Sequence, residues 1–173
     1  EALVSMLEGK GTPQIVQRRG LGIRRPIIVL GHSFPEDAPT AVAHDLTLTC
    51  HSLALGHALS AAAVRAGRVA RVHIHIDSGL HRDGVSLDEG VALAEALRDL
   101  PGLAVEGIST HMANADEPDD SFSDAQAALF RAATERLPWV PYRHTANSAT
   151  ALRRAALRLE QRCWRRYAQR CRH

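Results

Sequence analysis

Three short blocks of the same design constrain the fold of this chain more than any other feature of its sequence. Each block is a run rich in β-branched residues that ends in polar, charged or glycine residues. The blocks are residues 72–82, 106–117 and 143–149. Their polar ends repeat at 29 and 37 residues, counted from Arg82 to His111 to Ser148. This spacing predicts successive strand–helix units, with the polar clusters at the carboxyl ends of parallel strands, where β/α barrels bind their ligands.

The rest of the chain alternates strand and helix in the same way. We expect strands at residues 26–31, 46–49, 71–77, 104–110 and 142–146, and helices at residues 52–66, 86–100 and 123–136. A weaker helix should follow Ser33, whose spacing to Glu36 is that of a capping box, although Pro39 disfavours it. With 173 residues, the chain is shorter than a complete eight-unit barrel of about 250 residues. The fold class expected is therefore α/β, a partial TIM-type barrel of about five parallel units.

The strand at residues 71–77 is apolar on one face and polar on the other, the polar side chains being His73, His75 and Asp77. A parallel strand that is covered on both faces is normally apolar throughout. The polar face therefore indicates an interior that binds a ligand. The His73–His75 pair leaves open a metal-dependent barrel hydrolase, but no bridging lysine is available and we expect no metal.

Charge is distributed unevenly along the chain. Residues 1–152 carry 13 basic and 18 acidic side chains, whereas residues 153–173 carry eight arginines and one glutamate. Lys10 is the only lysine. Three cysteines without a paired framework favour the reducing cytoplasm. The chain has no apolar run of membrane-spanning length, so we expect no contact with a membrane. Its basic tail has no nucleic-acid-binding module around it, so we expect no nucleic-acid partner.

The blocks give the chain its resemblance to the alanine racemase family, enzymes that carry pyridoxal 5'-phosphate in a β/α barrel. The family's D-T/S-G-x-x-R turn matches residues 77–82, its E-G-(I/L)-x-(T/S)-H-(F/M)-x-x-A-D block matches 106–116, and its H-x-A-N-S-A block matches 144–149. The resemblance covers residues 23–159 and implies the family's strands 3 to 7, without the first, second and eighth strands or the C-terminal β domain. Residues 1–22 are then an irregular segment, and residues 160–173 an Arg/Cys-rich tail without resemblance.

The resemblance also implies a role for each matched residue. Arg82 would contact the substrate carboxylate and the cofactor's phenolic oxygen, for which the guanidinium fork is suited. His111 would stack on the pyridine ring, and Asp116 would line the path of substrate entry. The phosphate would be held at a strand-to-helix turn by Asn147, Ser148 and Ala149.

The implied function is the interconversion of L- and D-alanine, which supplies D-alanine for peptidoglycan, by a homodimer in the bacterial cytoplasm. Departures from the family pattern qualify this expectation. The lysine that carries the cofactor and the second catalytic base have no counterpart here, so the chain alone should be inactive, as a fragment or a shifted reading frame would be. His75 replaces a lysine that steadies the arginine equivalent to Arg82. The alternatives are a pyridoxal-phosphate carrier protein of related fold, a racemase of another amino acid and, less favoured, the metal-dependent hydrolase.

Overall fold

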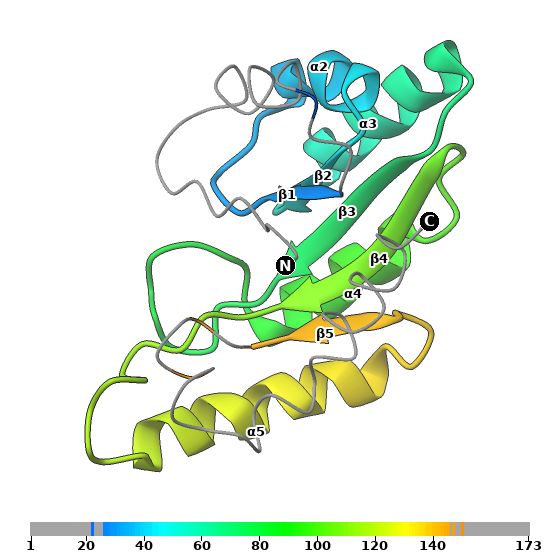
Figure 1. Cartoon of the computed structure of the whole chain (residues 1–173). Coiled ribbons are helices and arrows are strands. Elements are labelled where there is room, and N and C mark those ends of the chain that lie inside the picture. Colours follow the sequence, from blue (N-terminus) through cyan, green and yellow to red (C-terminus); the bar gives the residue numbers. More distant parts are fainter. Residues whose placement is uncertain (1–21, 23–25, 146, 148–149, 151–173) are drawn as a thin grey trace.

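A computed structural model describes residues 22, 26–145, 147 and 150 of the chain. Five parallel strands form one sheet in the order β1-β2-β3-β4-β5. They are β1 (Ile27–Val29), β2 (Leu46–Cys50), β3 (Ala70–His75), β4 (Leu103–Ser109) and β5 (Tyr142–His144). The sheet curls into a half-barrel (Figure 1), which confirms the expected partial α/β barrel. The predicted segments 1–22 and 160–173 lie almost entirely outside the described residues.

Helices connect the strands and cover one face of the sheet (Figure 1). They are the 3-10 helix η1 (Pro35–Asp37), α2 (Ala38–Ala43), α3 (Leu53–Ala66), α4 (Leu87–Leu97) and α5 (Ser121–Arg136). Both α3 and α4 pack against β3 and β4, while α5 packs beside α4. None of the helices in the described part of the chain has the length and apolar character needed to cross a membrane.

Two helix starts agree with the sequence prediction and two differ from it. The side chain of Ser52 caps α3 by accepting from the Leu55 amide, and Ser86 forms a capping box with Glu89 at the start of α4, where the predicted range begins. The box expected at Ser33 is wrong, because Ser33 is buried and the carboxylate of Asp37 instead accepts from the Phe34 amide at 2.9 Å. Pro39 then lies in the first turn of α2, where a missing amide hydrogen costs little.

The start of α5 also differs from the prediction, which places it at residue 123, two residues after the observed start. The helix begins at Ser121, whose amide donates to the Asp119 carboxylate at 2.9 Å, and Ser123 is buried inside its first turn. A serine within two residues of a helix start resembles a cap in sequence, and only the tertiary burial of its side chain distinguishes the two positions.

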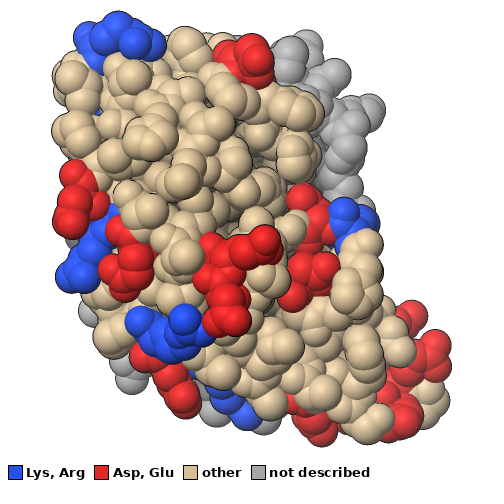
Figure 2. Space-filling model, turned by 180° about the vertical axis from the view of Figure 1, so that it is seen from behind, with Lys and Arg blue, Asp and Glu red and all other residues tan. Residues whose placement is uncertain are grey.

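The hydrophobic core lies between the sheet and its helices. Val72, Ile74 and Ile76 of β3 and its extension are fully buried there. Seen from behind, the molecule interleaves acidic and basic side chains rather than separating them by sign (Figure 2). One such contact joins two helices, where Arg136 of α5 pairs with Asp88 of α4 at 2.5 Å. The inner face of the sheet is different, because buried polar side chains line it: Thr47, Thr49, His73 and Ser109.

A β-bulge in β4 shapes this inner face. Val72 pairs with Val105 and His73 with Gly107, so Glu106 is the additional residue. The bulge places a residue without a side chain against the imidazole of His73, since a Cβ at Gly107 would lie 2.4 Å from Nδ1 of His73. Gly107 therefore makes room for a buried histidine inside the half-barrel.

Candidate active site

The residues singled out in the sequence lie in the loops that follow three adjacent strands. Arg82 is exposed in the loop after β3, and the partly buried His111 follows β4, with Asp116 exposed further along that loop. Asn147 follows β5 and is partly buried. Parallel pairing brings these three strand ends to one rim. Ser148 and Ala149 lie outside the described residues, so their assignment stays a prediction.

The turn before Arg82 is organised by Asp77. One carboxylate oxygen of Asp77 accepts the amide hydrogens of Gly79, Leu80 and His81 at 2.9, 3.0 and 3.1 Å. Burial by itself would raise the pKa of Asp77, but these amides and the nearby His81 imidazole lower it on balance. Asp77 thus remains a carboxylate that fixes the turn.

The loop that carries Arg82 returns to the end of β3 and is held there by backbone hydrogen bonds. The amide of Asp77 donates to the Val85 carbonyl at 2.8 Å, and the amide of Val85 donates to the His75 carbonyl at 3.0 Å. Gly84 makes this return possible. Its φ is 111°, and a Cβ there would lie 2.9 Å from the backbone nitrogen of Asp77.

A buried hydrogen-bond chain connects the loops that carry Arg82 and His111. The Thr110 hydroxyl donates to the Ile76 carbonyl at 2.7 Å, and the Ser78 hydroxyl lies 2.7 Å from Thr110 Oγ1. Because the hydrogen of Thr110 is already used, Ser78 donates to Thr110 and accepts from Gln126 Nε2 at 3.1 Å.

Gln126 of α5 extends this chain to the loop after β4. Its amide nitrogen also lies 3.2 Å from the His111 carbonyl, and its amide oxygen accepts from the Ala113 amide at 2.9 Å. The backbone on both sides of His111 is therefore fixed by a single buried side chain. Sequence reasoning missed Gln126, because nothing in the pattern of a helix indicates which of its polar residues turns inward.

The turn after β5 is built by Asn147. Its side-chain nitrogen donates to the Met112 carbonyl at 3.0 Å, and its oxygen accepts from the amide and the hydroxyl of Thr150, both at 2.9 Å. Thr150 is in helical conformation, and its two hydrogen bonds to Asn147, three residues before it, are of the kind that an N-cap residue accepts at a helix start. Backbone amides at such a start are suited to an anion such as a phosphate.

The inner face below the rim carries three histidines that make hydrogen bonds. His73 Nδ1 lies 2.9 Å from His144 Nε2, and His75 Nδ1 lies 2.9 Å from the Ser109 hydroxyl. Burial, reinforced by His73 and His75, lowers the pKa of His144 well below its usual value. Burial likewise lowers the pKa of His75 to about 4, although Asp83 opposes this. The interior is thus polar and uncharged at His75 and His144 near pH 7.

The metal-hydrolase alternative gains no support from this face. His73 and His75 each use one ring nitrogen in a different hydrogen bond. Among the residues that the structure describes, neither belongs to a group of three potential metal ligands. A different group of histidines does meet that condition, and it is considered below.

A curled sheet of five parallel strands with helices on one face defines part of a β/α-barrel domain, a fold whose ligands bind at the carboxyl ends of its strands. The family model "Alanine racemase, N-terminal domain" matches residues 2–163. The chain belongs to the alanine racemase family.

Individual relatives agree with this assignment. The alanine racemase of Geobacter sulfurreducens is 41% identical over 143 residues, which cover 79% of this chain and 37% of that protein. The alanine racemase of Desulforamulus reducens is 37% identical over 139 residues, with 78% of this chain and 38% of that protein covered. The chain thus spans less than two fifths of the length of these curated relatives.

Solved structures show the same similarity. The alanine racemase of Clostridium difficile in complex with cycloserine superposes with a TM-score of 0.81 at 30% identity, covering 85% of this chain and 42% of that one. A histidine racemase from Leuconostoc mesenteroides superposes with a TM-score of 0.73 at 28% identity, covering 80% of this chain and 38% of that one. The fold is therefore shared by racemases that are named for different amino acids.

Proposed function

We propose that the protein acts in the pyridoxal-phosphate-dependent interconversion of L- and D-alanine, with this chain forming the part of the barrel that holds the cofactor's phosphate and the substrate's carboxylate. The observation that carries the proposal is the arrangement of Arg82, His111 and Asn147 at three adjacent strand ends, in a chain 41% identical to an alanine racemase over the matched region.

The residues present fit such a cofactor at its phosphate end. The side chain of Asn147 is used in shaping the turn, through its bonds to Met112 and Thr150. Backbone amides after Asn147, together with the Ser148 hydroxyl, would hold the phosphate. When bound, pyridoxal phosphate supplies an electron sink for the pair left at the substrate Cα after deprotonation.

Arg82 and His111 would act on the other groups of the site. Arg82 supplies a guanidinium cation that orients a substrate carboxylate. The backbone of its loop is held in place by hydrogen bonds at Asp77 and at Val85. His111 would lie against the cofactor ring, with its backbone held by Gln126. Asp116, exposed at the outer part of the same loop, would line the route of substrate entry.

Alanine is the favoured substrate, because the curated relatives compared above are alanine racemases. We extend the proposal to a homodimeric enzyme of the bacterial cytoplasm that supplies D-alanine for the cell wall. The 173-residue chain itself should not racemise alanine, because its only lysine, Lys10, lies outside the matched motifs. Moving a proton between the two faces of Cα also requires a second base.

A chimera tests the proposal. In the alanine racemase of Geobacter sulfurreducens, the matched 143 residues would be replaced by the corresponding residues of this chain. We expect the chimera to bind pyridoxal phosphate and to racemise alanine faster than other amino acids, histidine included. A folded chimera that binds the cofactor but leaves alanine unchanged would contradict the proposal, and a preference for another amino acid would correct its substrate.

A further inference from the structure

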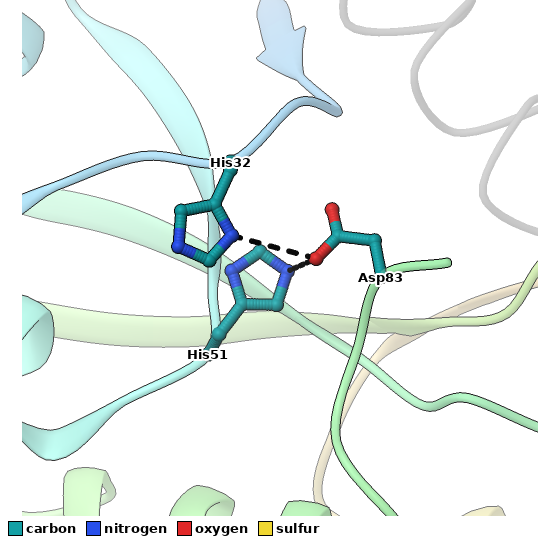
Figure 3. A group of neighbouring side chains, drawn as sticks. All are labelled: His32, His51 and Asp83. Atoms are coloured by element: carbon teal, nitrogen blue, oxygen red, sulfur yellow. Dashed lines mark ion pairs between the residues drawn. The ribbon is translucent and has the colours of Figure 1, made fainter. Parts of the chain in front are cut away.

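Three side chains from three separate loops converge beside the rim described above. His32 follows β1, His51 follows β2 directly and Asp83 lies in the loop after β3. The Nδ1 atom of His32 lies 3.5 Å from Oδ1 of Asp83, and Nε2 of His51 lies 3.2 Å from the same oxygen. Figure 3 shows both imidazoles directing a nitrogen toward this carboxylate. All three ligand atoms lie within 4.8 Å of one another.

His51 is the unusual member of this cluster. Its side chain is only 9% exposed, yet neither ring nitrogen has a hydrogen-bond partner among the residues that the structure describes. Nε2 of His51 lies close to Oδ1 of Asp83, but the two groups do not have the geometry of a hydrogen bond. A buried polar atom without a partner costs about 1–3 kcal/mol, and such atoms in folded proteins call for an unseen ion or water.

We propose that His32, His51 and Asp83 bind a divalent transition-metal ion, of which Zn²⁺ fits the site best. Nitrogen and oxygen ligands lie about 2.0–2.2 Å from Zn²⁺, so two ligands of a tetrahedral ion are about 3.3–3.6 Å apart. The distances of 3.5 and 3.2 Å from the two histidines to Asp83 are close to this value. Ca²⁺ takes six to eight oxygen ligands and Mg²⁺ prefers oxygen, so two imidazoles disfavour both ions.

The direction of the pKa shift of His51 is compatible with this ligand set. Burial lowers the pKa of His51, and the neighbouring His32 lowers it further. The Asp83 carboxylate raises it, but the net shift is downward. A neutral imidazole with a free lone pair is the form that binds a metal. The two rings are stacked, with centroids 4.9 Å apart and planes 10° apart, so one ring must turn to bring its nitrogen to the ion. His32 can do so because its side chain is 56% exposed.

The proposed ion would join the loops after three consecutive strands and leave one coordination position open to water. It would also hold Asp83 in place, the residue next to Arg82. The site is independent of the proposed racemase function, because its ligands come from residues that have no role in that proposal. No sequence motif indicates it, since the ligands are separated by 19 and 32 residues.

Zn²⁺ titration of the full chain, by calorimetry against a competing chelator, tests the proposal. We expect one Zn²⁺ bound at this site per chain. His51→Gln and Asp83→Asn should each weaken binding on the order of 100-fold. His32→Gln should also weaken Zn²⁺ binding. Because His32 is exposed, this substitution should disturb folding less than the other two. His57→Gln, at an exposed position of α3, is the matched control and should bind as the unmodified protein does.

Co²⁺ substitution identifies the ligands independently. We expect the visible band of tetrahedral Co²⁺ with nitrogen and oxygen ligands, without sulfur-to-metal charge transfer, and the band should disappear in Asp83→Asn. A Cys163→Ser/Cys171→Ser double variant should leave both measurements unchanged. Unaltered Zn²⁺ affinity in His51→Gln and Asp83→Asn, or loss of binding only in the double cysteine variant, would overturn the proposal.

Discussion

Mild acid should destabilise this protein through His75, a partly buried imidazole on the inner face of β3. Burial lowers the pKa of His75 from 6.5 to about 4, with partial opposition from Asp83. The unfolded chain therefore binds a proton near pH 6.5, whereas the folded chain resists it until about pH 4. Between these values the unfolded state holds more protons. The contribution to stability is thus complete above pH 6.5 and is lost as the pH falls toward 4.

The size of the effect follows from the two pKa values. Their difference corresponds to about 3 kcal/mol in full, and to about 2 kcal/mol between pH 7 and pH 4.5. His75→Asn removes the titrating ring but keeps a polar atom near the position of Nδ1, which lies 2.9 Å from the Ser109 hydroxyl. The unmodified protein should therefore lose about 2 kcal/mol more unfolding free energy than this variant over the same pH interval.

Urea unfolding followed by circular dichroism, at several pH values and in the presence of EDTA, measures this difference. Stopping at pH 4.5 limits the contribution of carboxylates such as Asp77, whose lowered pKa also costs stability on further acidification. His57→Asn, at an exposed position of α3, is the control and should follow the unmodified protein. If the curves for the unmodified protein and His75→Asn run parallel from pH 7 to pH 4.5, the reasoning is refuted.

Three further predictions address the rim. Gln126→Leu should cost about 2–4 kcal/mol in urea unfolding, because it leaves the buried partners of Gln126 without their bonds; a cost below about 0.5 kcal/mol, typical of a surface change, would contradict this. Gly84→Ala should lower the unfolding free energy by at least about 2 kcal/mol, and more than Gly67→Ala, where φ is 61° and nothing lies within 4 Å; equal losses would exclude the close approach to Asp77 as the cause. In the chimera, Arg82→Ala should abolish most racemisation while Ser148→Ala mainly weakens cofactor binding, and equal effects in kinetics and cofactor titration would disprove this division of roles.

Much of the fold could be predicted from local sequence because its signals are local. Ser52, Ser86 and Gly67 mark helix ends through contacts within a few residues, and the structure contains each of these contacts. The polar face of β3 was also visible, since alternation along a strand directly separates its two faces. The order of strands then follows from joining each parallel strand to the next through a helix.

The features that could not be predicted depend on contacts distant in sequence. The bulge at Glu106 depends on which residue of β4 faces His73, and no local pattern specifies that register. Gln126 connects two loops through its burial alone. His32, His51 and Asp83 come from three different loops, and only the folded structure shows that they meet (Figure 3). For the same reason the roles expected of Arg82 and His111 came from a family resemblance rather than from the residues themselves.

The strand order of the sheet has a consequence for how the chain can be assembled. Within the described residues, each strand pairs only with the strands that come before and after it in the chain. A growing chain can therefore add one strand and one helix at a time, each step closing a loop of one connection rather than waiting for a distant partner. During synthesis, β2 can dock on β1 before β4 exists, so the sheet can form from its amino-terminal edge as the ribosome proceeds.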